Sequence, residues 1–131
     1  MNKNQVIISW IFQLVAAIIM LQTLRFKFGA HPDSVMLFTT LGMEPWGRIG
    51  TGVIELLASI LLFIPRTVWF GALMAVGLMA GAIFFHLTIL GVNFNNDGGS
   101  LFGLALAVMV SALVILFLRR KQIPYLATFF S

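Results

Sequence analysis

A glutamate in the middle of a long apolar segment is the residue of this sequence best placed for chemistry. Glu55 lies within WGRIGTGVIELLASILLFI, residues 46–64, a segment long enough to cross a bilayer as a helix. A charged side chain at the centre of a membrane costs about 2.5–3.5 kcal/mol on insertion scales, so such residues are rare and often functional. Glu55 is therefore a candidate for ligand binding or proton handling. The alternative is a neutral acid that holds neighbouring helices together through hydrogen bonds.

Other polar or small residues share a helical face with Glu55. At 3.6 residues per turn, that face also holds Arg48, Thr51, Gly52 and Ser59. Because polar residues within membrane spans normally face the interior of the bundle, we expect this face to point inward. Gln13, in the first apolar segment, is a candidate hydrogen-bond partner for Glu55, although helix packing is the more common role of such a residue.

His86, near the end of the third apolar segment, is the second candidate. Measured from the turn that joins the second and third segments at 1.5 Å per residue, Glu55 lies about 15 Å along the hairpin, Arg48 about 26 Å and His86 about 31 Å. A direct Glu55–His86 pair is therefore not expected. We expect a polar cleft with His86 and Arg48 at its mouth and Glu55 at its floor. The alternative for His86 is a structural histidine bonded to a backbone carbonyl or a loop residue.

The composition indicates a membrane protein. Of the 131 residues, 60% are apolar and 9% are charged, whereas about 25% of a typical soluble domain is charged. Too little polar surface exists to cover a water-soluble globule, so lipid must surround the chain. The basic residues are dispersed or lie at segment ends, which argues against nucleic-acid binding and for a role in membrane topology. The absence of cysteine excludes thiolate metal sites and thiol catalysis.

Four apolar segments predict an all-α, transmembrane four-helix bundle that forms a single membrane domain over residues 1–131. The expected spans cover residues 5–24, 46–64, 67–92 and 100–118. Within the first long loop, Pro32 can start a short helix and Gly42 can end it; this helix either lies in the interface or folds back over the bundle mouth. The basic residues predict cytoplasmic termini in the plasma (inner) membrane.

Two further motifs bear on partners and metals. Gly77 and Gly81 form a GxxxG pair that could face a second copy of the chain or a partner subunit. The turn residues Asn93 and Asp97 resemble the start of a calcium loop, but the twelfth position is Leu104 and supplies no bidentate acid. We therefore expect no metal site.

The segment from Gly47 to His86, GRIGTGVIELLASILLFIPRTVWFGALMAVGLMAGAIFFH, resembles the central hairpin of the DoxX family. The preceding Lys27-Phe28 and the later Asp97–Ala105 are also similar to the family pattern, whereas the glycines common in its first span are absent here. The resemblance implies a four-helix membrane protein and singles out Glu55 and His86. The family takes its name from small subunits associated with a thiosulfate:quinone oxidoreductase, and most of its members have no established activity.

These observations favour a redox-associated subunit that binds a quinone-like or other small hydrophobic molecule. The candidate ligand-binding or proton-handling residues are Glu55, His86, Arg48 and Gln13. Because the chain holds no visible electron carrier, we do not expect it to be an enzyme on its own, and a redox partner subunit or a homo-oligomer would complete it. The alternatives are a non-enzymatic membrane scaffold and a small transporter or proton path through Glu55.

Overall fold

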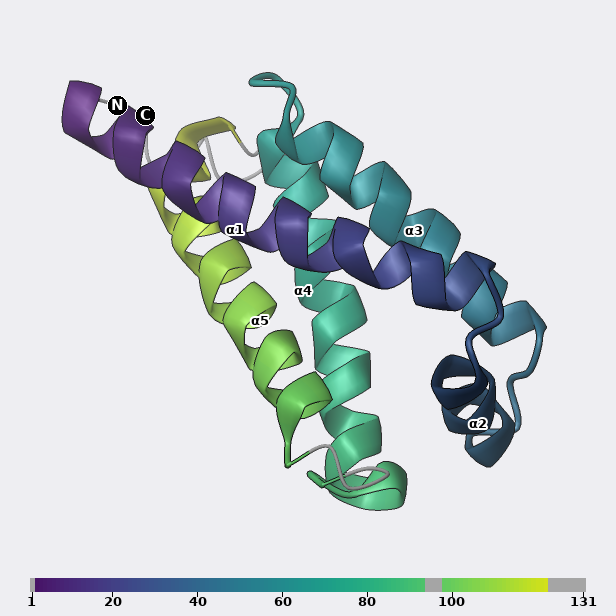
Figure 1. Ribbon diagram of the computed structural model, residues 1–131. Coiled ribbons are helices and arrows are strands. Elements are labelled where there is room, and N and C mark those ends of the chain that lie inside the picture. The colour runs from purple at the N-terminus through teal and green to yellow at the C-terminus, as the bar shows by residue number, and fades with distance from the viewer. Residues whose placement is uncertain (1, 94–97, 123–131) are drawn as a thin grey trace.

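The structure, a computed structural model, describes residues 2–93 and 98–122, and the described residues form five α-helices (Figure 1). The helices are α1 (Lys3–Phe28), α2 (Pro32–Thr40), α3 (Trp46–Leu62), α4 (Val68–Phe85) and α5 (Ser100–Leu118). A π-helical turn, η1 (His86–Leu90), continues α4, and a 3-10 turn, η3 (Arg120–Gln122), follows α5. The predicted turn at residues 94–97, which includes Asp97, and the last nine residues lie outside the described residues.

Three helices within the described ranges are long and apolar enough to cross a membrane: α1, α4 continued by η1, and α5. Large apolar side chains such as Ile18, Val110 and Phe117 are more than half exposed on them, as expected where lipid replaces water. The fold therefore indicates a small multi-pass membrane protein. α3 is shorter, and its 17 residues rise about 25 Å. That it forms a fourth span remains a prediction.

The four long helices form a ring in which α1 packs against α3 and α5, and α4 packs against the same two helices. In Figure 1, the α1–α3 pair and the α4–α5 pair cross and then diverge toward the end of the bundle that holds α2. At the opposite end, Arg119 Nε donates to Ser9 Oγ at 2.8 Å, so α1 begins where α5 ends. We call these two ends the α2 end and the Arg119 end.

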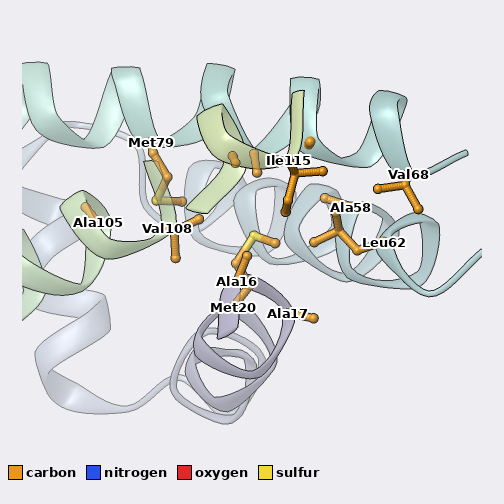
Figure 2. Close-up of a cluster of buried hydrophobic side chains, with 13 residues drawn as sticks. Ala16, Ala17, Met20, Ala58, Leu62, Val68, Met79, Ala105, Val108 and Ile115 are labelled. Carbon is orange, nitrogen blue, oxygen red and sulfur yellow. The ribbon is translucent and has the colours of Figure 1, made fainter. Parts of the chain in front are cut away.

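Small side chains let the helices approach closely. The buried core is shown in Figure 2, and six of its seven alanines are fully buried: Ala16, Ala17, Ala58, Ala72, Ala75 and Ala112. Met20, Leu62 and Ile115 fill the remaining space between the helices. One close contact lies at Gly71, where an added Cβ would be 2.9 Å from the Ala58 carbonyl oxygen. The backbones of α3 and α4 therefore touch at this point.

Local signals explain where the helices begin and end. Asn2 and Gln5 form a capping box at the start of α1, with Asn2 Oδ1 accepting from the Gln5 N–H at 2.8 Å. α2 begins at Pro32 and ends before Gly42, as predicted, and the positive φ of 73° at Gly42 suits glycine. α1 extends to Phe28, four residues beyond the predicted end of the first span at residue 24. This extension brings Lys27 into the bundle.

Candidate functional site

A cavity of about 550 Å³ lies at the α2 end, lined by residues of all five α-helices and of η1. Its volume falls in the range of small-molecule pockets, about 300–1,000 Å³. The lining is mainly apolar and includes Met20, Phe38, Phe85 and Val108. Leu37 and Phe38 of α2, and Leu41 directly after it, form part of the wall. Two positions were predicted for this helix, and the position over the bundle mouth agrees with the structure.

Glu55 is buried on the inward face of α3 and lines this cavity. Its Oε1 lies 2.8 Å from Lys27 Nζ, and its Oε2 accepts a hydrogen bond from Thr23 Oγ1 at 3.1 Å. Lys27 Nζ also lies 3.3 Å from Thr23 Oγ1. The three side chains thus form one polar cluster between α1 and α3, in which the ammonium and the carboxylate compensate each other's charge.

The geometry of α1 explains how a lysine near its end reaches the middle of α3. Side chains of an α-helix lean toward its N-terminus, and residues four apart lie on one face. Lys27 therefore points back over Thr23, away from the end of the helix and toward Glu55. Lys27 was expected in the loop after the first span, so its contact with Glu55 was not predicted. The signal that could have found it is the spacing of four residues between Thr23, inside the predicted span, and Lys27, three residues beyond its end.

Gln13, the predicted partner of Glu55, lies elsewhere. Its Nε2 donates to the Leu62 carbonyl oxygen at 2.7 Å, and its Oε1 accepts from Ser9 Oγ at 2.6 Å. Gln13 precedes Thr23 by ten residues, which is about 15 Å along α1, so it cannot reach the cavity. Together with Ser9 and Arg119 it joins α1 to α3 and α5 at the Arg119 end, where burial lowers the pKa of the Arg119 guanidinium below its usual value.

Arg48 is buried but is not among the residues that line the cavity, which differs from its expected position at the mouth. Its Nε donates to the two carboxylate oxygens of Glu44 at 2.9 and 3.0 Å. Its NH1 group donates to the Lys27 carbonyl oxygen. Arg48 therefore caps the C-terminal end of α1 and holds the residue that pairs with Glu55. Its role in the site is to position Lys27.

His86 lies at the junction of α4 and η1, is only 4% exposed and lines the same cavity as Glu55. Its Nδ1 lies 2.9 Å from the Ala82 carbonyl oxygen, which agrees with the structural alternative considered for this residue. Its Nε2 is also buried, and no group of the described residues forms a hydrogen bond with it. A buried polar atom without a partner is uncommon in folded proteins and points to an unseen ligand or water.

The helix changes from α to π at His86, and η1 ends at Leu90, directly before Gly91, whose φ is 81°. π-helical turns inside longer helices are rare and frequently occur at functional sites. No hydrogen bond joins His86 to Glu55 among the described contacts. This agrees with their estimated positions along the hairpin, which are too far apart for a direct pair. The two residues instead contribute separate polar groups to one apolar cavity.

Gly77 and Gly81 also line the cavity, and a Cβ added at either position would meet no atom within 4 Å. The GxxxG pair therefore lies where the cavity wall has no side chains. The predicted contact of this pair with a second copy or a partner subunit remains a prediction.

Comparisons with protein-family models, with curated proteins and with solved structures gave no match to this chain. The resemblance to the DoxX family therefore rests on the residues quoted for it. Within residues 2–93 and 98–122, no group of three or more His, Cys, Asp or Glu side chains is arranged to hold a metal ion. The polar groups of the site are the compensated Lys27–Glu55 pair, the Thr23 hydroxyl and His86. Four further polar side chains line the cavity: Gln22, Asp33, Ser34 and Thr51.

Proposed function

We propose that this chain is a multi-pass membrane protein that binds a small, mostly apolar, quinone-like molecule in the cavity at the α2 end. The observation that carries the proposal is the combination of an apolar cavity of about 550 Å³, a compensated Lys27–Glu55 pair and a nitrogen of His86 that has no partner in the described part of the chain. Binding sites for small molecules commonly have this composition, with few polar groups set in an apolar wall. The DoxX-like residues and the membrane setting agree with such a ligand.

The polar groups indicate a neutral ligand that carries oxygen atoms. The charges of Lys27 and Glu55 compensate each other, so a net charge on the ligand is not required. An ammonium group has three N–H donors, and the described contacts use two of those of Lys27, toward Glu55 and Thr23. The third can donate to a ligand oxygen. The apolar wall accommodates a ring and part of a hydrocarbon chain.

The expected role is to hold this molecule for a partner. The proposal assigns electron transfer to a redox partner subunit, because the sequence holds no cysteine for an iron–sulfur cluster and no visible carrier motif. A homo-oligomer is compatible with the same role. In this proposal, Glu55, Lys27 and His86 contact the ligand, while Arg48 acts through Lys27 and Gln13 stabilises the far end of the bundle.

A matched pair of glycine substitutions tests the proposal. Leucine at Gly81 would enter the cavity, whereas leucine at Gly103, which does not line it, also meets no atom within 4 Å of the new Cβ. Both changes raise helix propensity by a similar amount. We expect purified protein in lipid nanodiscs to bind decylubiquinone, the Gly81→Leu variant to lose at least tenfold in affinity and the Gly103→Leu variant to bind like the wild type.

Two results would contradict this function. One is that the wild-type protein takes up no more decylubiquinone than empty nanodiscs do, and that native mass spectrometry finds no co-purified apolar molecule. The other is equal binding by the two leucine variants. Loss of a stoichiometric protein partner in the Gly81→Leu variant, combined with absence of any ligand in the wild type, would favour the scaffold alternative.

A further inference from the structure

The hydrogen bond of His86 to the backbone fixes which of its ring nitrogens carries a hydrogen. A carbonyl oxygen can only accept, so the 2.9 Å contact with Ala82 requires a hydrogen on His86 Nδ1. In a neutral imidazole only one nitrogen is protonated, and the other is an acceptor. Nε2, the nitrogen without a partner, is therefore the acceptor of this ring. The α-helical spacing of four residues between Ala82 and His86 holds this orientation in place.

An acceptor in an apolar cavity that has no partner among the described residues restricts which ligand groups can bind beside it. A hydroxyl or N–H group of a ligand can donate to Nε2, whereas a carbonyl oxygen would place one lone pair against another. The ring of Phe102 lies beside the imidazole, with centroids 5.7 Å apart, and offers no donor. Within residues 2–93 and 98–122 no group donates to Nε2, so the bound molecule can supply the donor, in place of any water there.

The other polar cluster of the cavity has the opposite preference. Lys27 has an N–H group beyond those directed at Glu55 and Thr23, and this group can only donate. A ligand oxygen near Lys27 must accept, and a ligand group near His86 must donate. A hydroxyl group satisfies either requirement, since it both donates and accepts. A carbonyl satisfies the first requirement alone.

We propose that the cavity selects the reduced, hydroxyl-bearing form of its ligand, a hydroquinone, over the quinone, through donation of a ligand hydroxyl to His86 Nε2. This inference rests on the proposed function and specifies which form of the ligand is bound. No electron or proton transfer within the chain is part of it. The protein would then hold a quinol in the membrane in preference to a quinone, and the partner reaction would consume or supply a quinol.

The direct test compares the two forms of one probe. Decylubiquinol and decylubiquinone are titrated anaerobically into the wild-type protein in nanodiscs. We expect the quinol to bind about tenfold tighter, which corresponds to about 1.4 kcal/mol, near the value of one hydrogen bond. A redox-inert pair, 2-methyl-1-naphthol and its methyl ether, should show the same preference for the hydroxyl form. In the His86→Phe variant the preference should fall to about one, because phenylalanine offers no acceptor for a ligand hydroxyl.

The outcomes separate this inference from the function on which it rests. Equal binding of the two forms, or tighter binding of the quinone, would overturn the inference and leave the proposed function standing. Binding of neither form would overturn both. A preference that survives in His86→Phe would also overturn the assignment of the acceptor to His86.

A spectroscopic test reads the tautomer of His86 directly in the wild-type protein. Nitrogen-15 chemical shifts of labelled histidine distinguish the two neutral tautomers and the imidazolium. The chain has two histidines, and the signal absent from the His86→Phe variant, or the signal shifted by the addition of decylubiquinol, identifies His86. We expect a protonated Nδ1 and an unprotonated Nε2. The opposite tautomer, or an imidazolium, would make Nε2 a donor and would refute the predicted preference for the quinol.

Discussion

Replacing Lys27 with methionine would test whether the ion pair with Glu55 supports the fold. The N–O distance of 2.8 Å corresponds to a Coulomb attraction of about 6 kcal/mol at an effective dielectric constant of about 20. Desolvation of both charges offsets much of this attraction, but removing one partner leaves the other charge buried and typically costs about 3–5 kcal/mol. Methionine keeps roughly the length of the side chain, so the loss of stability reports mainly on the removal of the charge.

The two single substitutions, Lys27→Met and Glu55→Gln, should differ in how much they lower the free energy of unfolding. The Glu55 side chain is only 4% exposed and has no route to solvent when Lys27 is removed, so we expect Lys27→Met to destabilise by about 3–4 kcal/mol. The Lys27 side chain is 16% exposed near the end of α1 and can turn outward, so Glu55→Gln should cost less, about 1–2 kcal/mol. The double variant should be little less stable than the milder single variant.

The free energy of unfolding would be measured by steric trapping in bicelles, for the wild type, both single variants and the double variant. The coupling energy from this cycle should reach at least 2 kcal/mol. Single effects that simply add, within about 0.5 kcal/mol, would show that the pair is not energetically coupled and would refute the reasoning. Thr67→Ala, at a hydroxyl outside the cavity, serves as a control for the loss of a polar contact.

Two further changes test the packing. Gly71→Ala should destabilise by about 1–3 kcal/mol because its Cβ would press on the Ala58 carbonyl, whereas Gly50→Ala, with nothing within 4 Å, should be neutral or stabilising in the same thermal scan. Equal melting temperatures for these two variants would contradict the close approach of α3 and α4. Ser9→Ala removes the acceptor of Arg119 and should cost about 1–3 kcal/mol in the steric-trapping measurement. An effect below about 0.5 kcal/mol would show that the Arg119 contact does not stabilise the bundle.

The sequence was sufficient to predict the inner face of one helix. The polar face of the second apolar segment points inward as expected, with Glu55 and Ser59 buried on it. Such predictions succeed because lipid penalises polar groups on the outside, so helical spacing alone indicates the inner face. The short helix from Pro32 was predicted for a similar reason, since its start and end signals are local.

The pairing of these residues could not be predicted from the sequence. Whether Glu55 meets Gln13 or Lys27 depends on how far α1 slides along α3, and apolar packing permits many such alignments. The end of α1 could not be predicted either, because the local sequence does not show that Arg48 caps it. Without that contact, Lys27 is assigned to the following loop. The sequence also could not predict that Nε2 is the acceptor of the His86 ring. That assignment follows from the contact between Nδ1 and the Ala82 carbonyl oxygen, which residue spacing does not reveal.

Polar contacts hold α1 to its neighbours near both of its ends. Gln13 and Lys27 connect it to α3, and Ser9 connects it to Arg119 at the end of α5. Different side chains form these contacts, so a substitution that removes the contact at one end of α1 leaves the contact at the other end in place.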